Sequence, residues 1–277
     1  MAPRLWIGNL GAIKIINRSP NTMPLHTAIV PCLADNFAFL LHDDETGATA
    51  VVDVPEAAPV IAALQARGWA LSDIVLTHHH ADHIDGVEEL KATLNPKARV
   101  VGAAADAHRL PPLDLALTEG DTFEIGTAQA HVIDVPGHTV GHVAYHVPAA
   151  QAAFTGDSLM AMGCGRLFEG TPAQMWDSLQ KLAALPDETR IFSGHDYIGG
   201  NAAFALSIEP ENARIIARSK AHAANPAPDE VHVHLADERA TNPFLRAGTP
   251  EVNAALGMSD APDGAVFAEL RARKDSF

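Results

Sequence analysis

Four histidines and an aspartate crowd into one short stretch of the chain, and their residue types are those that bind metal ions. The stretch reads Thr77-His78-His79-His80-Ala81-Asp82-His83. In extended backbone, side chains two residues apart point to the same side, so His78 and His80 can bind one ion. Where the chain turns into the next helix, the backbone changes direction, so the side chains of Asp82 and His83 can reach a second ion. Imidazole and carboxylate donors suit zinc, iron or manganese.

The surroundings of this stretch argue against a chance histidine patch on a solvated turn. A buried strand is expected directly before it, at 74–77, and a helix after it, beginning with a capping box formed by Asp85 and Glu88. Further candidate donors follow three later apolar strands, namely His138, Asp157 and His195. Because strand ends gather ligands at one edge of an α/β sheet, we expect all these donors to meet.

The scaffold that positions the donors is predicted to alternate strands and helices and then to become helical. Strands are expected at 26–30, 37–41, 49–52, 74–77, 99–102, 130–135, 143–146, 152–155 and 190–193. Helices are expected at 56–67, ending at Gly68, and after Thr171-Pro172, where Gln174 completes a capping box. After Gly199-Gly200 only helices are expected, at 201–207, 211–223, 251–256 and 265–274.

Composition narrows the function classes. The formal net charge of −15 argues against nucleic-acid binding, and no apolar run is long enough to span a bilayer. Two cysteines are too few for a disulfide framework, so we expect a reducing compartment, the cytoplasm. Residues 1–23 are expected to be a disordered N-terminal extension; a weak transit peptide, or a true start at Met23, would also fit their basic, acid-free composition.

The donor order His-x-His-x-Asp-His, followed by His, Asp and His, resembles the metallo-β-lactamase superfamily and, within it, the glyoxalase II or hydroxyacylglutathione hydrolase family. Supporting strings are Gly-His-Thr-Val-Gly-His at 137–142, Phe-Thr-Gly-Asp-Ser at 154–158, Gly-Cys-Gly-Arg-Leu-Phe-Glu-Gly-Thr at 163–171 and Arg-Ala-Arg-Lys-Asp at 271–275. The resemblance implies an α/β fold, a metallo-β-lactamase-like αββα sandwich over 24–198 with a small helical substrate-binding domain over 199–277.

The resemblance also assigns the site. It implies two divalent ions per chain, with zinc the first expectation and iron or manganese the alternatives. One ion would be held by His78, His80 and His138, the other by Asp82, His83 and His195, with Asp157 bridging both. Asp82 and Asp157 are therefore the expected catalytic carboxylates. His79 is expected to point away from the ions, and His142 either supports a ligand or serves packing.

The implied reaction is hydrolysis of S-D-lactoylglutathione, and of related 2-hydroxyacylglutathiones, to the acid and glutathione in methylglyoxal detoxification. A thiolate leaves without a dedicated general acid because its conjugate acid has a pKa of about 8.5. A monomer is expected, in which the glutathione thioester is bound by Arg166, Phe168, Tyr197, Arg271 and Lys274. Phe168 stands where some glyoxalase II sequences carry Tyr. A mononuclear iron persulfide dioxygenase of the same fold and a non-catalytic metal-binding module are the alternatives.

Overall fold

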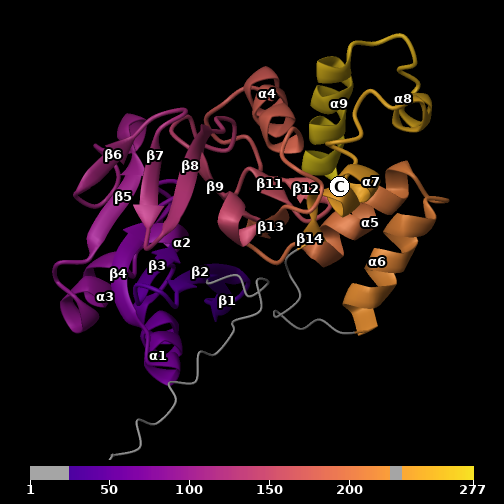
Figure 1. Ribbon diagram of the computed structural model, residues 1–277. Helices are drawn as coiled ribbons and strands as arrows, with labels where there is room; N and C mark the ends of the chain where they lie inside the picture. Colours follow the sequence, from indigo (N-terminus) through magenta and orange to yellow (C-terminus); the bar gives the residue numbers. More distant parts are fainter. Residues whose placement is uncertain (1–24, 225–232) are drawn as a thin grey trace, which may run out of the picture.

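Two six-stranded sheets lie face to face, with helices on both outer faces, in a computed structural model that describes residues 25–224 and 233–277 (Figure 1). This is the expected αββα sandwich. The extension expected over 1–23 lies outside the described residues. No helix among the described residues is long and apolar enough to cross a membrane.

The first sheet has the order β1-β2-β3-β4-β5-β6. Its strands are β1 (Leu25–Cys32), β2 (Asn36–Asp43), β3 (Ala48–Val52), β4 (Ala70–Val75), β5 (Arg99–Ala103) and β6 (Leu115–Leu117). The first three pair antiparallel and the rest parallel. Helices α1 (Ala57–Arg67) and α3 (Val87–Leu94) cover its outer face with apolar side chains such as Leu64 and Leu90. Helix α1 ends at Gly68, in the left-handed conformation, as predicted.

The second sheet has the order β14-β13-β10-β9-β8-β7. Its strands are β7 (Thr122–Ile125), β8 (Ala128–Asp134), β9 (Val143–Val147), β10 (Ala152–Gly156), β13 (Arg190–Ser193) and β14 (Val233–His234). Strands β10 and β13 are parallel, so their carboxyl ends meet at one edge. Helix α4 (Pro172–Ala183) packs on the outer face, and the capping box predicted for Thr171 and Gln174 is confirmed. A small ribbon, β11 (Leu159–Met160) with β12 (Gly163–Cys164), follows β10.

Between the sheets, apolar side chains from alternate strand positions form the central core. Phe39 from the first sheet lies 5.7 Å from Phe154 and 5.3 Å from Phe192 of the second, measured between ring centroids. Each fully buried side chain of this size contributes about 1.5–3 kcal/mol to stability. The core therefore fixes the separation of the two sheets, on which the geometry of the donor side chains depends.

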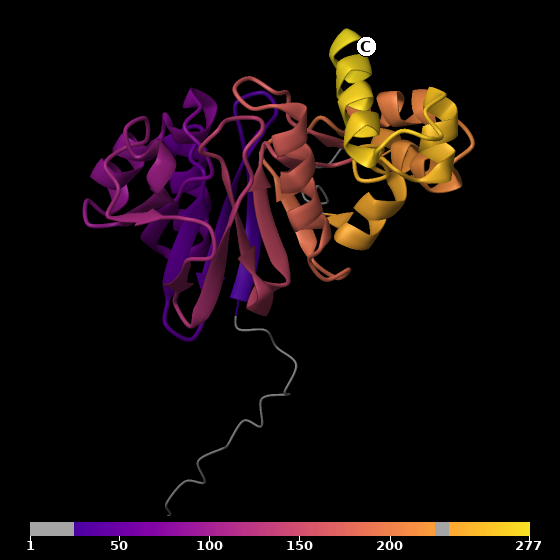
Figure 2. The ribbon, with the colours of Figure 1, turned by 90° about the horizontal axis from the view of Figure 1, so that it is seen from above.

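The C-terminal region packs beside the second sheet and α4 (Figure 2). Its helices are α5 (Ile198–Ile208), α6 (Ala213–Ala224), α7 (Leu235–Thr241), α8 (Pro250–Leu256) and α9 (Asp263–Ser276). Two described elements of this region were not predicted, namely α7 and the two-residue strand β14, which pairs with β13; nor were the short strands β6, β7, β11 and β12 of the sandwich. The buried carboxylate of Glu238 accepts from Arg218 and from the Met162 amide, which ties this region to the sandwich.

The capping box predicted for Asp85 and Glu88 is wrong. The chain forms a single turn, α2 (Ala81–Ile84), and then restarts as α3 after Gly86, with no side-chain cap. Gly86 lies so close to the backbone that an added Cβ would be 2.6 Å from the carbonyl carbon of Glu56. The amide of Gly86 donates to Val54 O, and that of Val54 to His83 O. These bonds to the segment after β3, rather than a helix cap, hold the histidine-bearing turn in place.

Candidate metal centre

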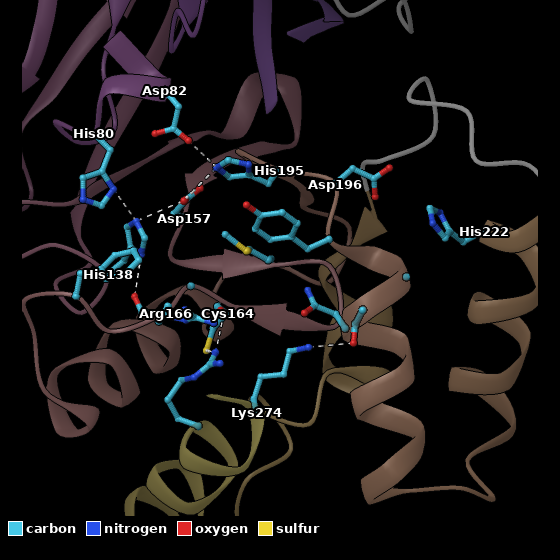
Figure 3. A pocket seen from close by; sticks show the side chains of 18 residues that line it. His80, Asp82, His138, Asp157, Cys164, Arg166, His195, Asp196, His222 and Lys274 are labelled. Atoms are coloured by element: carbon cyan, nitrogen blue, oxygen red, sulfur yellow. Dashed lines mark hydrogen bonds and ion pairs between the residues drawn. The ribbon is translucent and has the colours of Figure 1, made fainter. Parts of the chain in front are cut away.

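All seven predicted donors lie together where the strand ends of the two sheets meet. Figure 3 shows the five of them that line a pocket, namely His80, Asp82, His138, Asp157 and His195. The histidine stretch 77–83 follows β4, His138 lies between β8 and β9, and Asp157 and His195 directly follow β10 and β13. Segments more than a hundred residues apart in the sequence thus supply one cluster. Three groups of donor atoms have all members within 4.8 Å of one another. They are His78, His80 and His138; His78, His83 and Asp157; and Asp82, His83 and His195.

The first group contains three imidazoles. His138 Nε2 lies 3.0 Å from His80 Nδ1, and the rings of His78 and His138 are 5.1 Å apart between centroids. His138 is oriented by its other nitrogen, since Nδ1 donates to the carbonyl of Arg166 at 2.8 Å. A metal-binding histidine is commonly oriented in this way.

The third group, formed by Asp82, His83 and His195, contains two imidazoles and a carboxylate. His83 Nε2 and His195 Nε2 are 3.3 Å apart, and Asp82 Oδ2 lies 3.4 Å from His195 Nε2. Asp157 lies between the first group and the third. Its Oδ2 lies 3.4 Å from His138 Nε2 and 3.3 Å from His195 Nε2, and its Oδ1 lies 3.5 Å from His83 Nε2. One carboxylate therefore reaches histidines of both groups, as a bridging ligand must.

Metal ions fit these residues. Among the described residues, His78 Nε2 and Asp157 Oδ1 are buried side-chain atoms without a hydrogen-bond partner. Such atoms are costly unless something binds them, and both are donors in the second of the three groups. Two imidazole nitrogens also lie close together in the pair His80 and His138 and in the pair His83 and His195. A cation that accepts lone pairs from all of them satisfies the whole cluster, and no thiolate is among the donors.

The pKa values of the clustered histidines also indicate that the donor cluster favours a bound cation. Burial opposes the charged form of His83 and His195, but neighbouring carboxylates outweigh it, chiefly Asp157. Together they raise the pKa of His83 to about 10 and that of His195 to about 11. Burial and the nearby His83 instead hold the pKa of His78 well below its ordinary value. Because metal ligands must be unprotonated, a divalent cation would displace the protons of His83 and His195 and neutralise Asp157 in their place.

Three supporting residues were not predicted. Asp53 is buried in the left-handed conformation, with φ +55°, and accepts from Thr77 and from His83 Nδ1 at 2.9 Å. Asp35 Oδ1 accepts from His195 Nδ1 at 3.0 Å, and Asn36 Nδ2 donates to Asp82 Oδ2 at 3.1 Å. Asp53 could have been predicted from the sequence, because it directly follows β3 just as Asp157 follows β10. Asp35 lies in the turn before β2 and Asn36 begins that strand, and nothing in the sequence around them pointed to a role.

His142 and Gly165 hold Asp157 from behind. His142 Nε2 accepts from the Asp157 amide at 3.0 Å, and its ring stacks on His78 with centroids 4.6 Å apart. Of the two expectations for His142, support of a ligand agrees with this geometry. Gly165 passes so close that an added Cβ would be 1.9 Å from Asp157 O. Any side chain at position 165 would therefore displace the backbone of Asp157, from which the carboxylate projects.

The donor cluster opens into a pocket of about 800 Å³ (Figure 3). Its lining includes all five residues predicted to bind substrate: Arg166, Phe168, Tyr197, Arg271 and Lys274. Tyr197 stacks on His195 with centroids 4.7 Å apart, and burial raises the pKa of its hydroxyl to about 12. The Tyr197 hydroxyl is therefore neutral at physiological pH and can donate a hydrogen bond.

Arg271 and Lys274 are placed differently within this pocket. Arg271 is 5% exposed, and its guanidinium donates to Cys164 O at 3.0 Å and to Asp275 at 2.8 Å. Its Nε is buried without a hydrogen-bond partner among the described residues. Lys274 is half-buried and donates to Gly200 O at 3.0 Å. With Arg166, these groups form a cationic wall in a protein of net charge −15.

This αββα fold, with its histidine and aspartate cluster between the two sheets, defines a member of the metallo-β-lactamase superfamily, whose family model matches residues 37–195. The fold is similar to that of ETHE1 from Myxococcus xanthus, with a TM-score of 0.59, 23% identity and coverage of 91% of this chain and 98% of that one. It is also similar to TTHA1623 in a di-iron-bound form, with a TM-score of 0.56, 28% identity and coverage of 79% and 100%.

The chain belongs to the hydroxyacylglutathione hydrolase family, also called glyoxalase II, and is a hydrolase. The model described as hydroxyacylglutathione hydrolase C-terminus matches residues 196–277 and so begins where the superfamily model ends. The hydroxyacylglutathione hydrolase of Cereibacter sphaeroides strain ATCC 17029 is 62% identical over 257 residues, covering 92% of this chain and all of the relative. That of Ruegeria pomeroyi is 56% identical with the same coverage.

Proposed function

We propose that this protein hydrolyses S-D-lactoylglutathione and related 2-hydroxyacylglutathiones to the hydroxy acid and glutathione, using two divalent ions. The observation that carries the proposal is the position of Asp157. It lies within 3.5 Å of histidines from both donor groups, at the closed end of a pocket with a cationic wall. The names of the close relatives support the same substrate class.

The donor geometry supports one position formed by His78, His80 and His138, and another formed by Asp82, His83 and His195, with Asp157 shared. We propose zinc as the occupant, with iron or manganese as alternatives that nitrogen and oxygen donors accept equally. Divalent ions held there supply Lewis acidity and a water of lowered pKa.

The remaining chemistry falls to the protein. Arg166 and Lys274 present cations to the carboxylates of the glutathione moiety, and Tyr197 offers a hydroxyl to its amide groups. The exposed Phe168 ring lies 5.7 Å from His80 and 5.2 Å from His138, so it forms an apolar wall next to the reacting carbonyl. The thiolate released has a conjugate acid pKa of about 8.5 and needs no protonating side chain.

The pocket draws residues from both halves of the chain. Arg166 and Phe168 come from the sandwich, whereas Arg271 and Lys274 come from α9. This supports a catalytic domain over 24–198 and a helical substrate-binding domain over 199–277. Because one chain supplies the whole lining, a monomer can form the complete site.

The test is to measure metal content and thioester hydrolysis on one sample, for wild type and for His195→Ala. We expect about two ions per wild-type chain and rapid release of glutathione from S-D-lactoylglutathione. His195→Ala, which removes a ligand of the second position, should lose about one ion and slow hydrolysis by orders of magnitude. Oxygen uptake with glutathione persulfide should be negligible in both proteins. Iron-dependent oxygen uptake that survives His195→Ala would instead identify a dioxygenase and overturn the proposal.

A further inference from the structure

A chain of charged side chains starts at His79, the one histidine of the 77–83 stretch that belongs to none of the three donor groups. His79 Nδ1 lies 3.0 Å from Asp106 Oδ2, and its Nε2 lies 3.7 Å from Glu169 Oε1. Arg109 joins these two carboxylates. We call Asp106, Arg109 and Glu169 the outer network. Its residues come from the segment after β5 and from the loop before α4.

Arg109 is the centre of the outer network. Its Nη2 donates to Asp106 Oδ1 at 2.5 Å and its Nε to the same oxygen at 3.1 Å. Its Nη1 and Nη2 donate to Glu169 Oε1 and Oε2 at 2.5 and 3.2 Å, a bidentate pair. The Asp106 side chain is 1% exposed, so its charge requires this partner. Without the guanidinium, two carboxylates would face each other next to His79.

The outer network joins three segments that shape one side of the site. The first is the histidine turn, through His79. The second is the loop that carries His138, because Glu169 Oε2 accepts from the Val140 amide at 2.8 Å. The third is the pocket wall itself, since Glu169 directly follows Phe168. Asp106 also packs against this His138 loop, where a Cβ added at position 141 would lie 2.2 Å from its Cγ.

The other half of the site is held by different residues. Asp35 orients His195, Asn36 holds Asp82, and Asp53 orients His83. Asp35 comes from the turn between β1 and β2, Asn36 is the first residue of β2, and Asp53 directly follows β3. The outer network contacts none of these three supports. Asp53 also reaches the first group, because Thr77, which donates to it, has its Oγ1 3.0 Å from His78 Nδ1, and Asp157 is shared between the first and third groups.

We propose that the outer network is a positioning device for the metal position formed by His78, His80 and His138 and for the Phe168 wall. It acts separately from the supports of the second position. The inference rests on the proposed function, because it assumes that the donors bind two ions. Loss of a residue that orients metal ligands typically weakens metal binding by about 10- to 100-fold. Breaking the network should therefore weaken one position by that factor and leave the other occupied.

Arg109→Met is the test variant, because it removes the guanidinium and keeps most of the apolar stem. Each protein is loaded with zinc and dialysed against a chelator at a concentration that leaves two ions on the wild type. We expect Arg109→Met to retain about one ion and His195→Ala to retain about one. The double variant should retain none, because the two changes affect different positions.

The matched control combines Asp35→Asn with His195→Ala. Both changes affect the second position, so this double variant should keep about one ion. Glu169→Gln nearly preserves the shape of the side chain, so it should lose less metal from the same position than Arg109→Met. It replaces Arg109→Met in the test if that variant folds poorly. With zinc in excess to refill both positions, Arg109→Met should still show a raised KM for the thioester, because the Phe168 wall has lost its anchor.

Two results would overturn the inference. One is wild-type retention of both ions by Arg109→Met and Glu169→Gln. The other is equal loss from both positions together with a lowered free energy of unfolding, which is what a merely structural role predicts. Two ions on the wild type without thioester turnover would refute the proposed substrate and leave the inference standing. A wild-type chain that binds no ions would overturn both.

Discussion

Replacement of Arg271 by Ala should affect folding as much as substrate binding, whereas replacement of Lys274 should affect mainly substrate binding. Both residues lie on α9 and line the pocket, and from the sequence they are equivalent members of one basic helix end. The structure separates them by burial, since the Arg271 side chain is only 6% exposed. The two substitutions therefore form a natural pair for comparison.

The magnitude for Arg271 follows from its contacts. The buried bond to Cys164 O involves a charged donor and is worth about 1.5–3 kcal/mol. The guanidinium lies 5.2 Å from the Phe244 centroid, a cation–π contact worth about 0.5–2 kcal/mol. The pair with Asp275, whose side chain is 41% exposed, adds at most about 1 kcal/mol. We expect Arg271→Ala to lower the free energy of unfolding by about 3 kcal/mol.

Lys274 donates one hydrogen bond, to Gly200 O, from a half-buried position, and its ammonium lies 5.5 Å from the Phe204 ring centroid and 5.4 Å from that of Phe277. Because such contacts are weak where solvent reaches the cation, Lys274→Ala should lower the free energy of unfolding by only about 1 kcal/mol. A lost charge-assisted contact to a substrate carboxylate is worth about 1.5–3 kcal/mol, so KM for the glutathione thioester should rise about tenfold or more.

The assays are urea unfolding and steady-state hydrolysis, at matched metal content. Arg271→Lys, which keeps the charge and loses the planar set of donors, should recover only part of the stability. The reasoning is refuted if Arg271→Ala unfolds like the wild type while its KM rises. In that case Arg271 acts on substrate and its buried contacts contribute little.

Asp157→Ala should lose both ions together in metal analysis, because one carboxylate serves both donor groups; retention of a full pair would contradict bridging. The Arg109 guanidinium holds the pKa of Glu169 at about 2, below its ordinary 4.5. The ionised carboxylate therefore stabilises the fold above pH 4.5, and this contribution is lost as the pH falls towards 2. In acid titration of unfolding, the wild type should lose more stability over this window than Glu169→Gln, and equal losses would count against the pair. Burial raises the pKa of the Cys164 thiol, so alkylation near pH 8, followed by mass spectrometry, should be slow in the native protein and fast in urea.

The sequence alone determined the elements and the donors. Apolar runs with β-strand or helical periodicity located β1, β10, α1 and α4 to within a few residues, because burial on one face imposes that spacing. All seven donors were named from their types and their places at strand ends, and the structure brings them together. Such motifs can be recognised in the sequence because they are local: every donor lies in a short segment that follows a strand in the chain.

Only the tertiary structure decided which residues support the donors and how the pocket wall is built. Asp35 contacts a histidine 160 positions away, and Arg109 pairs with Glu169 at a separation of 60. Nothing local distinguishes such residues from ordinary surface charges, since their role exists only when the sheets stack and the loops meet. The same holds for Arg271, where packing of α9 buries one arginine of a basic helix end and leaves Arg273 exposed. Periodicity reports which face of an element is buried, whereas the partner of a charge is chosen by contacts between elements distant in the sequence.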